Sequence, residues 1–563
     1  MTSVDRDDVG DIKPLAKRSA KRSAKRLAII GCGSSGLVTL KTALDFLPDW
    51  EVTAFEQSGS IRGCWGDPHP GFVSTSTRYT TQFACFPKWK ATVSPDGGQS
   101  REEFFRDSEY GDYLDEFAVA FKLHSHIRLH TRVENMQRLE TGGWRLRFDR
   151  DVESCFDSVI VCTGLAAIPK PIDSTVPCLS ANDLNLAERL SQINDKTIVV
   201  LGGGESAVDY ANRLARPDLN NQVYLSLRSG VRVSPRYHPV RGVPSDFLRN
   251  RLMLSADPAI RNWLGQIFVL ARIKYQNLFE TLFPAKHRSQ MDTDLLVENR
   301  KALWAKVLTL AAKDDLFNMF HNKSDDFLQA VGEDRITIVG PPLDNSFQKM
   351  RPFEYGPEVN QEAISIRPDF IVRAIGYQST LGQLSQPGQT QLSVLSLSDF
   401  YLGCCHAQFA DTYAVGYARP IIGNIPSISE MQARYVCGLI AGEFRRPGNI
   451  AERHLSERSW IQNRYQNLDA GKVFPVEMFP YCDQLAKLMN RPIGPRLLES
   501  PLGWLRTRLA PATTMHYFQD QSKNAEFIEE ARVYMPPLLI LLILFVKPFD
   551  WVFRLTKWIF GRS

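Results

Sequence analysis

The stretch "TIVVLGGGESAVDYANRLA", residues 197–215, decides the fold class. Its β-branched residues predict a buried strand, its glycines a tight turn, and its apolar residues at helical spacing a helix that follows directly. An earlier stretch, "KRLAIIGCGSSGLVTLKTAL" at residues 25–44, has the same order. A glycine turn between a strand and a helix lets backbone N–H groups approach a pyrophosphate at the helix N-terminus. The chain therefore predicts an α/β fold with two dinucleotide-binding, Rossmann-like domains.

The first motif predicts a site for FAD or NAD. Gly31 permits the tight turn, Gly33 lets the backbone approach the pyrophosphate, and Gly36 lets the helix pack close to the strand. The next predicted strand, "EVTAF" at residues 51–55, is followed by Glu56. A carboxylate there accepts hydrogen bonds from a ribose 2′-OH and repels a 2′-phosphate.

The second motif predicts a different nucleotide. It has Gly202, Gly204 and Ala207, and its second strand is followed by Arg228 and Ser229. A guanidinium and a hydroxyl suit a 2′-phosphate. We therefore expect FAD at the first motif and NADPH at the second. The alternative for each motif is a plain βαβ unit without a ligand.

The composition excludes a largely disordered chain. The chain has 563 residues, of which 44% are hydrophobic and 23% charged, enough for two or three domains with full cores. The net charge is only +5, and part of it lies in "AKRSAKRSAKR", residues 16–26. We expect a flexible arm there, or alternatively a membrane-surface or targeting segment, and no nucleic-acid partner.

The ten cysteines form no C-x-x-C pair and no zinc spacing with histidines, which predicts reduced thiols facing the cytosol and no metal site.

The C-terminus predicts membrane association. Residues 533–546, "VYMPPLLILLILFV", carry no charge, but a helix of this length spans about 21 Å, less than the ~30 Å hydrocarbon core. Residues 547–562, "KPFDWVFRLTKWIFGR", alternate aromatic and basic side chains, which is typical of a helix in the membrane interface. We expect residues 533–563 to contact membrane lipid on the cytosolic face of the endoplasmic reticulum. Spanning and interfacial arrangements both stay open, and a buried core helix is a third alternative.

Several further segments resemble one family. They are "GCWG" (63–66), "CFPKW" (85–89), "VCTGL" (161–165), "RAIGY" (373–377), "GNIPSISEMQAR" (423–434) and "YCDQLA" (481–486). On these segments the chain resembles the flavin-containing monooxygenases, which are class B flavoprotein monooxygenases, over almost its whole length. The resemblance implies FAD and NADPH as cofactors, and O2 and a small organic molecule as substrates. It implies that a C4a-(hydro)peroxyflavin inserts one oxygen atom, by N- or S-oxygenation or by Baeyer–Villiger chemistry. The oligomeric state stays unknown.

The resemblance also implies which residues serve the cofactors. Beside the two glycine motifs, including Ser35 and Ser206, the candidates are Gly63, Trp65, Val133, Gly164, Gly376, Gly423, Glu430 and Gln432.

Two departures from the family pattern concern the chemistry. The family fingerprint in the interdomain linker has a glycine and a histidine where this chain has Thr175 and Leu179. An asparagine beside the flavin aligns with Arg78, so we expect Arg78 to lie at the flavin as the catalytic residue and to favour a deprotonated peroxide. The alternative is that Arg78 points outward and pairs with a carboxylate.

These expectations give a domain plan. Residues 1–24 form the basic arm, 25–165 the first part of a discontinuous FAD domain, and 166–374 the NADPH domain with a helical insertion at about 241–328. Residues 375–500 complete the FAD domain, 501–532 form a linker and 533–563 the membrane segment. Two other functions stay open: a flavin-dependent reductase or oxidase that does not oxygenate, and a non-catalytic membrane-bound nucleotide-binding protein.

Overall fold

The computed structural model describes residues 24–560 except 67, 69–70, 96–99, 150–151, 167, 181–191, 239–241, 276–294, 313–320, 355–361, 385–394, 467, 469–472, 492, 495–496 and 520–521. The expected basic arm, apart from residue 24, and parts of the expected helical insertion lie outside the described residues.

A seven-stranded sheet contains strands from both ends of the chain. Its order is β19-β20-β21-β9-β1-β2-β5. The strands are β1 (Arg26–Ile30), β2 (Glu51–Phe55), β5 (Ile127–Arg128), β9 (Ser158–Val161), β19 (Phe400–Tyr401), β20 (Cys405–His406) and β21 (Thr412–Ala414). The run from β21 to β5 is parallel, while β19 and β20 extend the edge in antiparallel pairs. Residues 400–414 thus complete a sheet begun at residue 26.

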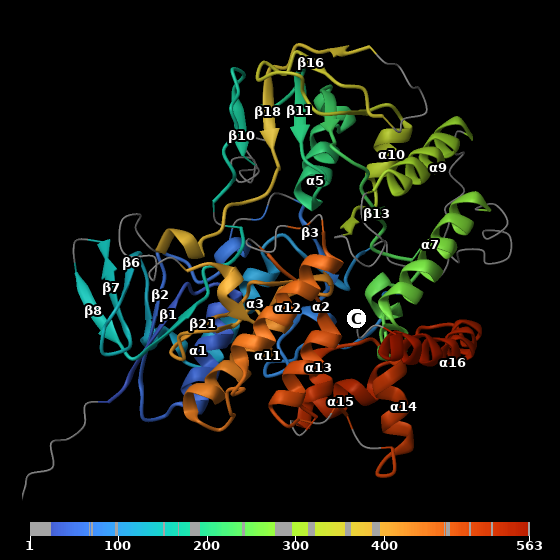
Figure 1. Ribbon diagram of the computed structural model, residues 1–563. Coiled ribbons are helices and arrows are strands. Elements are labelled where there is room, and N and C mark those ends of the chain that lie inside the picture. Colours follow the sequence, from blue (N-terminus) through green and yellow to red (C-terminus); the bar gives the residue numbers. More distant parts are fainter. Residues whose placement is uncertain are drawn as a thin grey trace, which may run out of the picture.

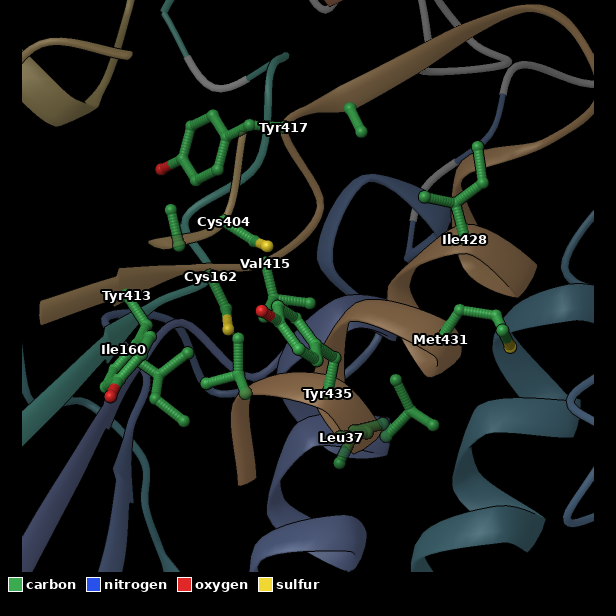
Figure 2. Packing of buried hydrophobic residues seen from close by; sticks show 14 of the residues in the cluster. Leu37, Ile160, Cys162, Cys404, Tyr413, Val415, Tyr417, Ile428, Met431 and Tyr435 are labelled. Carbon is green, nitrogen blue, oxygen red and sulfur yellow. The ribbon is translucent and has the colours of Figure 1, made fainter. Parts of the chain in front are cut away.

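Two helices far apart in sequence pack against each other on this sheet. α1 (Ser34–Phe46) follows the first glycine turn, and α11 (Ile425–Ala441) begins at an Asn424 cap whose side chain accepts from the Ser427 N–H. Figure 2 shows Leu37 of α1 beside Met431 and Tyr435 of α11, all of them buried. Because these apolar side chains are fully removed from water, their burial is a main stabilising contribution to the domain.

A five-stranded parallel sheet forms the second unit. Its order is β10-β18-β11-β12-β15, with β10 (Cys178–Ser180), β11 (Thr197–Leu201), β12 (Gln222–Ser226), β15 (Ile336–Val339) and β18 (Phe370–Arg373). α5 (Glu205–Leu214) follows the second glycine turn and packs on β11 and β12. Figure 1 shows this sheet above the seven-stranded one. Two parallel sheets, as the glycine motifs predict, are present.

Smaller elements surround the two sheets. An antiparallel sheet has β6 (Val133–Arg138), β7 (Trp144–Phe148) and β8 (Glu153–Phe156). Two-stranded pairs are β3 (Val73–Thr77) with β4 (Phe104–Arg106), β13 (Val233–Ser234) with β14 (Asn322–Lys323), β16 (Lys349–Met350) with β17 (Ile364–Ser365), and β22 (Ala418–Ile422) with β23 (Phe474–Glu477).

The remaining helices lie mainly beside and below the sheets (Figure 1). They are α2 (Arg78–Thr81), α3 (Glu109–Ala120), α6 (Arg251–Leu254), α7 (Pro258–Lys274), α9 (Leu295–Leu310), α10 (Phe327–Gly332), α12 (Ile450–Arg464), α13 (Met478–Leu488), α14 (Pro501–Leu509), α15 (Ser522–Glu530) and α16 (Pro537–Phe560). Short 3-10 turns include η1 (Gly63–Trp65) and η6 (Ser245–Leu248).

The C-terminal segment forms one helix, α16, with Pro548 inside it. Within the part of the chain that the structure describes, no helix combines the length and the apolar character needed to cross a membrane. α16 docks on α6 and α7 through polar contacts. The Asp257 N–H donates to the nearly buried Asp550 carboxylate (2.6 Å), while Lys547 and Arg554 donate to the side chain and carbonyl of Ser255. The spanning arrangement therefore has no support in the structure.

The first glycine turn is too tight for side chains. A Cβ on Gly36 would lie 1.9 Å from the Gly31 carbonyl oxygen, and Gly31 itself has φ +95° with the Cys162 carbonyl 2.7 Å from its Cβ position. Since both obstructing atoms belong to the backbone, they cannot rotate away. These glycines allow α1 to begin directly against β1 and β9.

We expect Gly36→Ala to lower the free energy of unfolding by about 1–3 kcal/mol, because overpacking must shift the backbone. Urea denaturation of the flavin-free protein would measure this loss without the contribution of ligand. Gly448→Ala is the matched control, since a Cβ there meets no atom within 4 Å. Equal midpoints for the two variants would contradict this account of the turn.

Candidate functional site

The N-terminus of α1 opens onto a large cavity. Gly33 is the N-cap of α1, and a Cβ on it would lie 3.3 Å from the Cα of Gly63 in η1. Two glycines therefore let two backbone segments approach each other beside the first-turn N–H groups. Ser35, in the same turn, shares a 2.8 Å hydrogen bond with Ser429 of α11. This arrangement fits a pyrophosphate, which binds unpaired N–H groups at a helix N-terminus.

Glu56 lies where the sequence predicts a ribose acceptor. It directly follows β2, is 9% exposed and lines the cavity. One carboxylate oxygen accepts from the Cys32 N–H (2.9 Å) and the other from the Ser58 N–H (2.9 Å). Each carboxylate oxygen has two lone pairs, so both can still accept from a ribose hydroxyl.

The second turn has the same construction with more open space. Gly202 has φ +125°, and a Cβ there would lie 2.3 Å from the carbonyl oxygen of Ala374. Ala374 directly follows β18, the strand that pairs with β11. A Cβ on Gly204, the N-cap of α5, would meet no atom within 4 Å. Ala207 is buried in the first turn of α5, whereas Ser206 is exposed. The space above Gly204 fits a second pyrophosphate.

Arg228 and Ser229 follow the carboxyl end of β12, which is the strand next to β11. Arg228 is exposed. In a dinucleotide-binding sheet this position lies beside the adenosine ribose.

The two connections between the sheets run side by side. The Lys170 N–H donates to the Gly376 carbonyl (3.0 Å) and the Gln378 N–H to the Ile168 carbonyl (2.7 Å), with an antiparallel bridge between Pro169 and Tyr377. We call residues 168–170 with 376–378 the connecting ribbon. Of the predicted cofactor residues, Gly376 lies in the ribbon and Gly164 precedes it; they have φ +87° and +75° and open space at both Cβ positions.

Hydroxyl groups fix the lower end of the ribbon. Thr163 Oγ1 is 2.6 Å from the Tyr417 hydroxyl and donates to Thr380 Oγ1 (2.8 Å), which itself donates to the Gly164 carbonyl (3.0 Å). Burial raises the pKa of Tyr417 to about 12, so its hydroxyl stays protonated at neutral pH.

A single cavity of about 840 Å³ joins these features. The predicted cofactor residues that line it are Gly31, Gly33, Ser35, Glu56, Gly63, Trp65, Val133, Gly164 and Gly423. Glu205, the first residue of α5, lines the same cavity. The other predicted residues of the second unit are not among its lining residues: Gly202, Gly204, Ser206, Ala207, Arg228, Ser229 and Gly376.

Two predicted cofactor residues hold protein segments instead. The fully buried Glu430 carboxylate accepts from the N–H groups of Ala84 (2.6 Å) and Cys85 (2.9 Å), which fixes the Cys-Phe-Pro turn. Gln432 accepts from the Gly416 N–H (3.0 Å) and donates to the Tyr481 hydroxyl (2.8 Å). Neither side chain lines the cavity.

Arg78, the predicted catalytic residue, is likewise not among the lining residues of the cavity. Its guanidinium pairs with Glu109 (2.5 Å), donates to the Phe104 carbonyl (3.1 Å) and lies over the rings of Trp89 and Phe105. This placement corresponds to the alternative in which Arg78 pairs with a carboxylate. Arg78 is thus engaged by α3 and β4, away from the space between the glycine turns.

Several ionisable side chains on the cavity wall were missed by the sequence reasoning, among them Glu205, Arg249, His321, Lys323 and Arg419. Burial raises the pKa of Glu205, and the positive charge of Arg419 opposes this shift. Burial lowers the pKa of Arg419, and Glu205 opposes that shift. No motif marks these residues, because four separate parts of the chain contribute them.

Two nucleotide-binding turns, one lining the cavity and the other followed by Glu205 on its wall, are typical of flavoproteins that work with a nicotinamide cofactor. The sequence model described as flavin-binding monooxygenase-like matches residues 24–296. Flavin-containing monooxygenase 3 from Homo sapiens is 29% identical over 284 residues, which cover 45% of this chain and 50% of that protein. The alignment thus spans about half the length of this relative.

Longer alignments extend over most of the chain. 4-hydroxybenzoate brominase (decarboxylating) from Pseudoalteromonas luteoviolacea (strain 2ta16) is 24% identical over 529 residues, covering 89% of this chain and 90% of the brominase. Oxidized steroid monooxygenase bound to NADP has a similar fold, with a TM-score of 0.54 and 17% identity over 82% of this chain and 97% of that one. Residues 24–296 are thus similar to flavin-binding monooxygenases, and most of the chain aligns with the brominase and shares the fold of the steroid monooxygenase.

We expect Arg228→Ala to weaken NADPH binding by about 1.5–3 kcal/mol and to leave NADH binding nearly unchanged, because only NADPH has a 2′-phosphate to accept charge-assisted hydrogen bonds. Dissociation constants of both nucleotides for the oxidised flavoprotein would measure this. Arg216→Ala is a control, because Arg216 is an exposed arginine of the same domain that pairs with Asp218. Equal losses for NADPH and NADH would rule out the assignment.

Proposed function

We propose that the protein is an NADPH-dependent flavoprotein monooxygenase that inserts one oxygen atom into a small organic molecule. The observation that carries this proposal is the shared cavity, in which Gly33 and Glu56 of one nucleotide unit and Glu205 of the other line the same space. Hydride transfer requires a nicotinamide and a flavin to meet, and this geometry allows it. The similarity of residues 24–296 to flavin-binding monooxygenases supports the oxygenation chemistry.

The cofactors supply the reaction, since reduced flavin activates O2 without a protein nucleophile. In the balanced reaction, substrate, O2, NADPH and H⁺ give oxygenated substrate, NADP⁺ and H₂O. The residues of this chain bind and orient the cofactors and shield them from water. Glu56 holds the FAD ribose, Gly63 and Trp65 line the cavity beside it, and Arg228 selects NADPH. The hydroxyl cluster of Thr163, Thr380 and Tyr417 fixes the chain where it passes between the two sheets.

A disulfide reductase is less well supported. Such an enzyme needs a redox cysteine pair beside its flavin. Cys404 and Cys405 have sulfur atoms 3.7 Å apart, but both are buried at the turn between β19 and β20 and neither lines the cavity.

The purified protein should be yellow, should bleach with NADPH in the absence of O2, and should form a product with one ¹⁸O atom from ¹⁸O₂ when sulfides, amines or ketones are supplied. Gly33→Val should lose flavin, because its side chain would fill the gap to Gly63. NADPH consumption matched entirely by hydrogen peroxide, with no oxygenated product, would identify an oxidase instead.

The proposal extends to a membrane surface, with the endoplasmic reticulum as its location. α7, α14 and α16 lie on one side of the molecule (Figure 1). Large apolar side chains on them are exposed: Trp263, Ile267, Leu502, Leu505, Leu541, Phe545, Phe549 and Trp551. In the sequence of α16, Lys547 lies between Phe545 and Phe549, and Arg554 follows Trp551. An exposed apolar face with basic neighbours suits the headgroup region of an anionic membrane.

We expect Phe545→Glu with Trp551→Glu to lower binding to phosphatidylcholine–phosphatidylserine vesicles by about 10- to 100-fold, because two large apolar groups no longer enter the bilayer. Cosedimentation measures the bound fraction, and flavin content checks the fold. Leu343→Glu, at an exposed leucine outside these helices, is the control. Unchanged vesicle binding in the double variant would refute the membrane surface.

A further inference from the structure

Two cations on the cavity wall, the buried Lys323 and the partly exposed Arg249, share one carboxylate. Lys323 Nζ lies 2.7 Å from Asp246 Oδ1, and Arg249 Nη1 lies 3.2 Å from the same oxygen. The side chains of Lys323 and Asp246 are 5% and 6% exposed, so water screens this group poorly. Both cations line the cavity, whereas Asp246 lies behind them and also accepts from the Thr77 N–H (3.0 Å).

The same wall carries Arg419 and Glu205. The charge of each acts against the pKa shift that burial causes in the other. Asp246 thus carries two cations, Lys323 and Arg249, and its single negative charge balances one of them. Glu205 has Arg419 and Asp209 near it. Behind them, Asp325 pairs with both Arg236 (3.3 Å) and Arg101 (3.5 Å). One positive charge is therefore in excess at the Lys323–Asp246–Arg249 group. His321 lies beside Lys323 in sequence and also lines the cavity.

The wall is rigidly placed between the two nucleotide turns. Asp246 of η6 is fixed to the start of α2 through Thr77, and Asn322, the neighbour of Lys323, donates to the Gly203 carbonyl (2.8 Å). The pyrophosphates of both dinucleotides already have helix N-termini at α1 and α5. The excess charge is therefore available to a third molecule. Among the described residues, the Arg249 side chain donates only to Asp246, which leaves most of its five donors for that molecule.

A buried positive charge without a counter-ion is costly, and an anion that enters the cavity removes this cost. We propose that Arg249 and Lys323, with Arg419, bind the carboxylate of a monoanionic substrate. A single excess charge matches a carboxylate better than a phosphate dianion, and the planar guanidinium of Arg249 matches carboxylate geometry. This inference rests on the proposed function and names the substrate class for it.

Three sulfides of similar size and different charge test the proposal: 4-(methylsulfanyl)benzoate, its methyl ester, and 4-(methylsulfanyl)benzylamine, which is a cation. For the wild type we expect kcat/KM for the benzoate to exceed that for the ester by at least about 10-fold, and the amine to be poorest. Arg249→Met should bring the ratio of benzoate to ester close to one, and Arg249→Lys should restore part of it. Arg216→Met, a surface control, should leave the ratio unchanged.

A binding measurement separates this inference from the function on which it rests. Titration of the oxidised flavoprotein with benzoate, followed by flavin absorbance, should give a dissociation constant about 10-fold higher for Arg249→Met. Flavin content and melting temperature show whether the variant folds. If no sulfide is oxygenated but benzoate binding depends on Arg249, the oxygenase function fails and the anion site stands. A wild-type ratio near one, or a loss confined to NADPH affinity, would overturn the anion site.

Discussion

The contact between α1 and α11 is the constraint on which the remaining architecture depends. α1 begins at the first glycine turn and α11 begins almost four hundred residues later, yet Ser35 and Ser429 hydrogen-bond and Leu37, Met431 and Tyr435 pack together (Figure 2). The chain must therefore return to its first sheet after building its second. This return brings Gly423 and Asn424 to the wall of the cavity that the first glycine turn and Glu205 of α5 also line.

Buried carboxylates complete this return. Glu430 of α11 fixes the backbone at Ala84 and Cys85, and Glu477 of β23 pairs with Arg261 of α7 and Arg464 of α12. Each carboxylate lies in the interior with its charge balanced by hydrogen bonds or cations, which is the condition for a buried charge to be tolerated. Removing one partner would leave an uncompensated charge. Acidic residues thus act as structural connectors in the completed first domain.

The sequence predicted those features of the fold and the site that depend on residues adjacent in the chain. Strand, glycine turn and helix are adjacent in the chain, so Gly31, Gly36, Gly202 and Glu56 could be assigned from spacing alone. Contacts between distant residues could not: Arg78 meets Glu109, Thr77 meets Asp246 across 169 positions, and Lys323 meets Asp246 across 77. Their partners are chosen by the packing of whole segments. The charged cavity wall and the structural role of Glu430 therefore emerged only in three dimensions.

The connecting ribbon has a mechanical consequence. Its two strands run in opposite directions and are cross-linked by backbone hydrogen bonds at residues 168–170 and 376–378. Side chains of the second unit add further links to the first: Arg213 of α5 donates to the Gly71 carbonyl, and Arg236 donates to the Val73 and Ser74 carbonyls. A displacement of one sheet against the other therefore has to break these contacts as well as distort the ribbon.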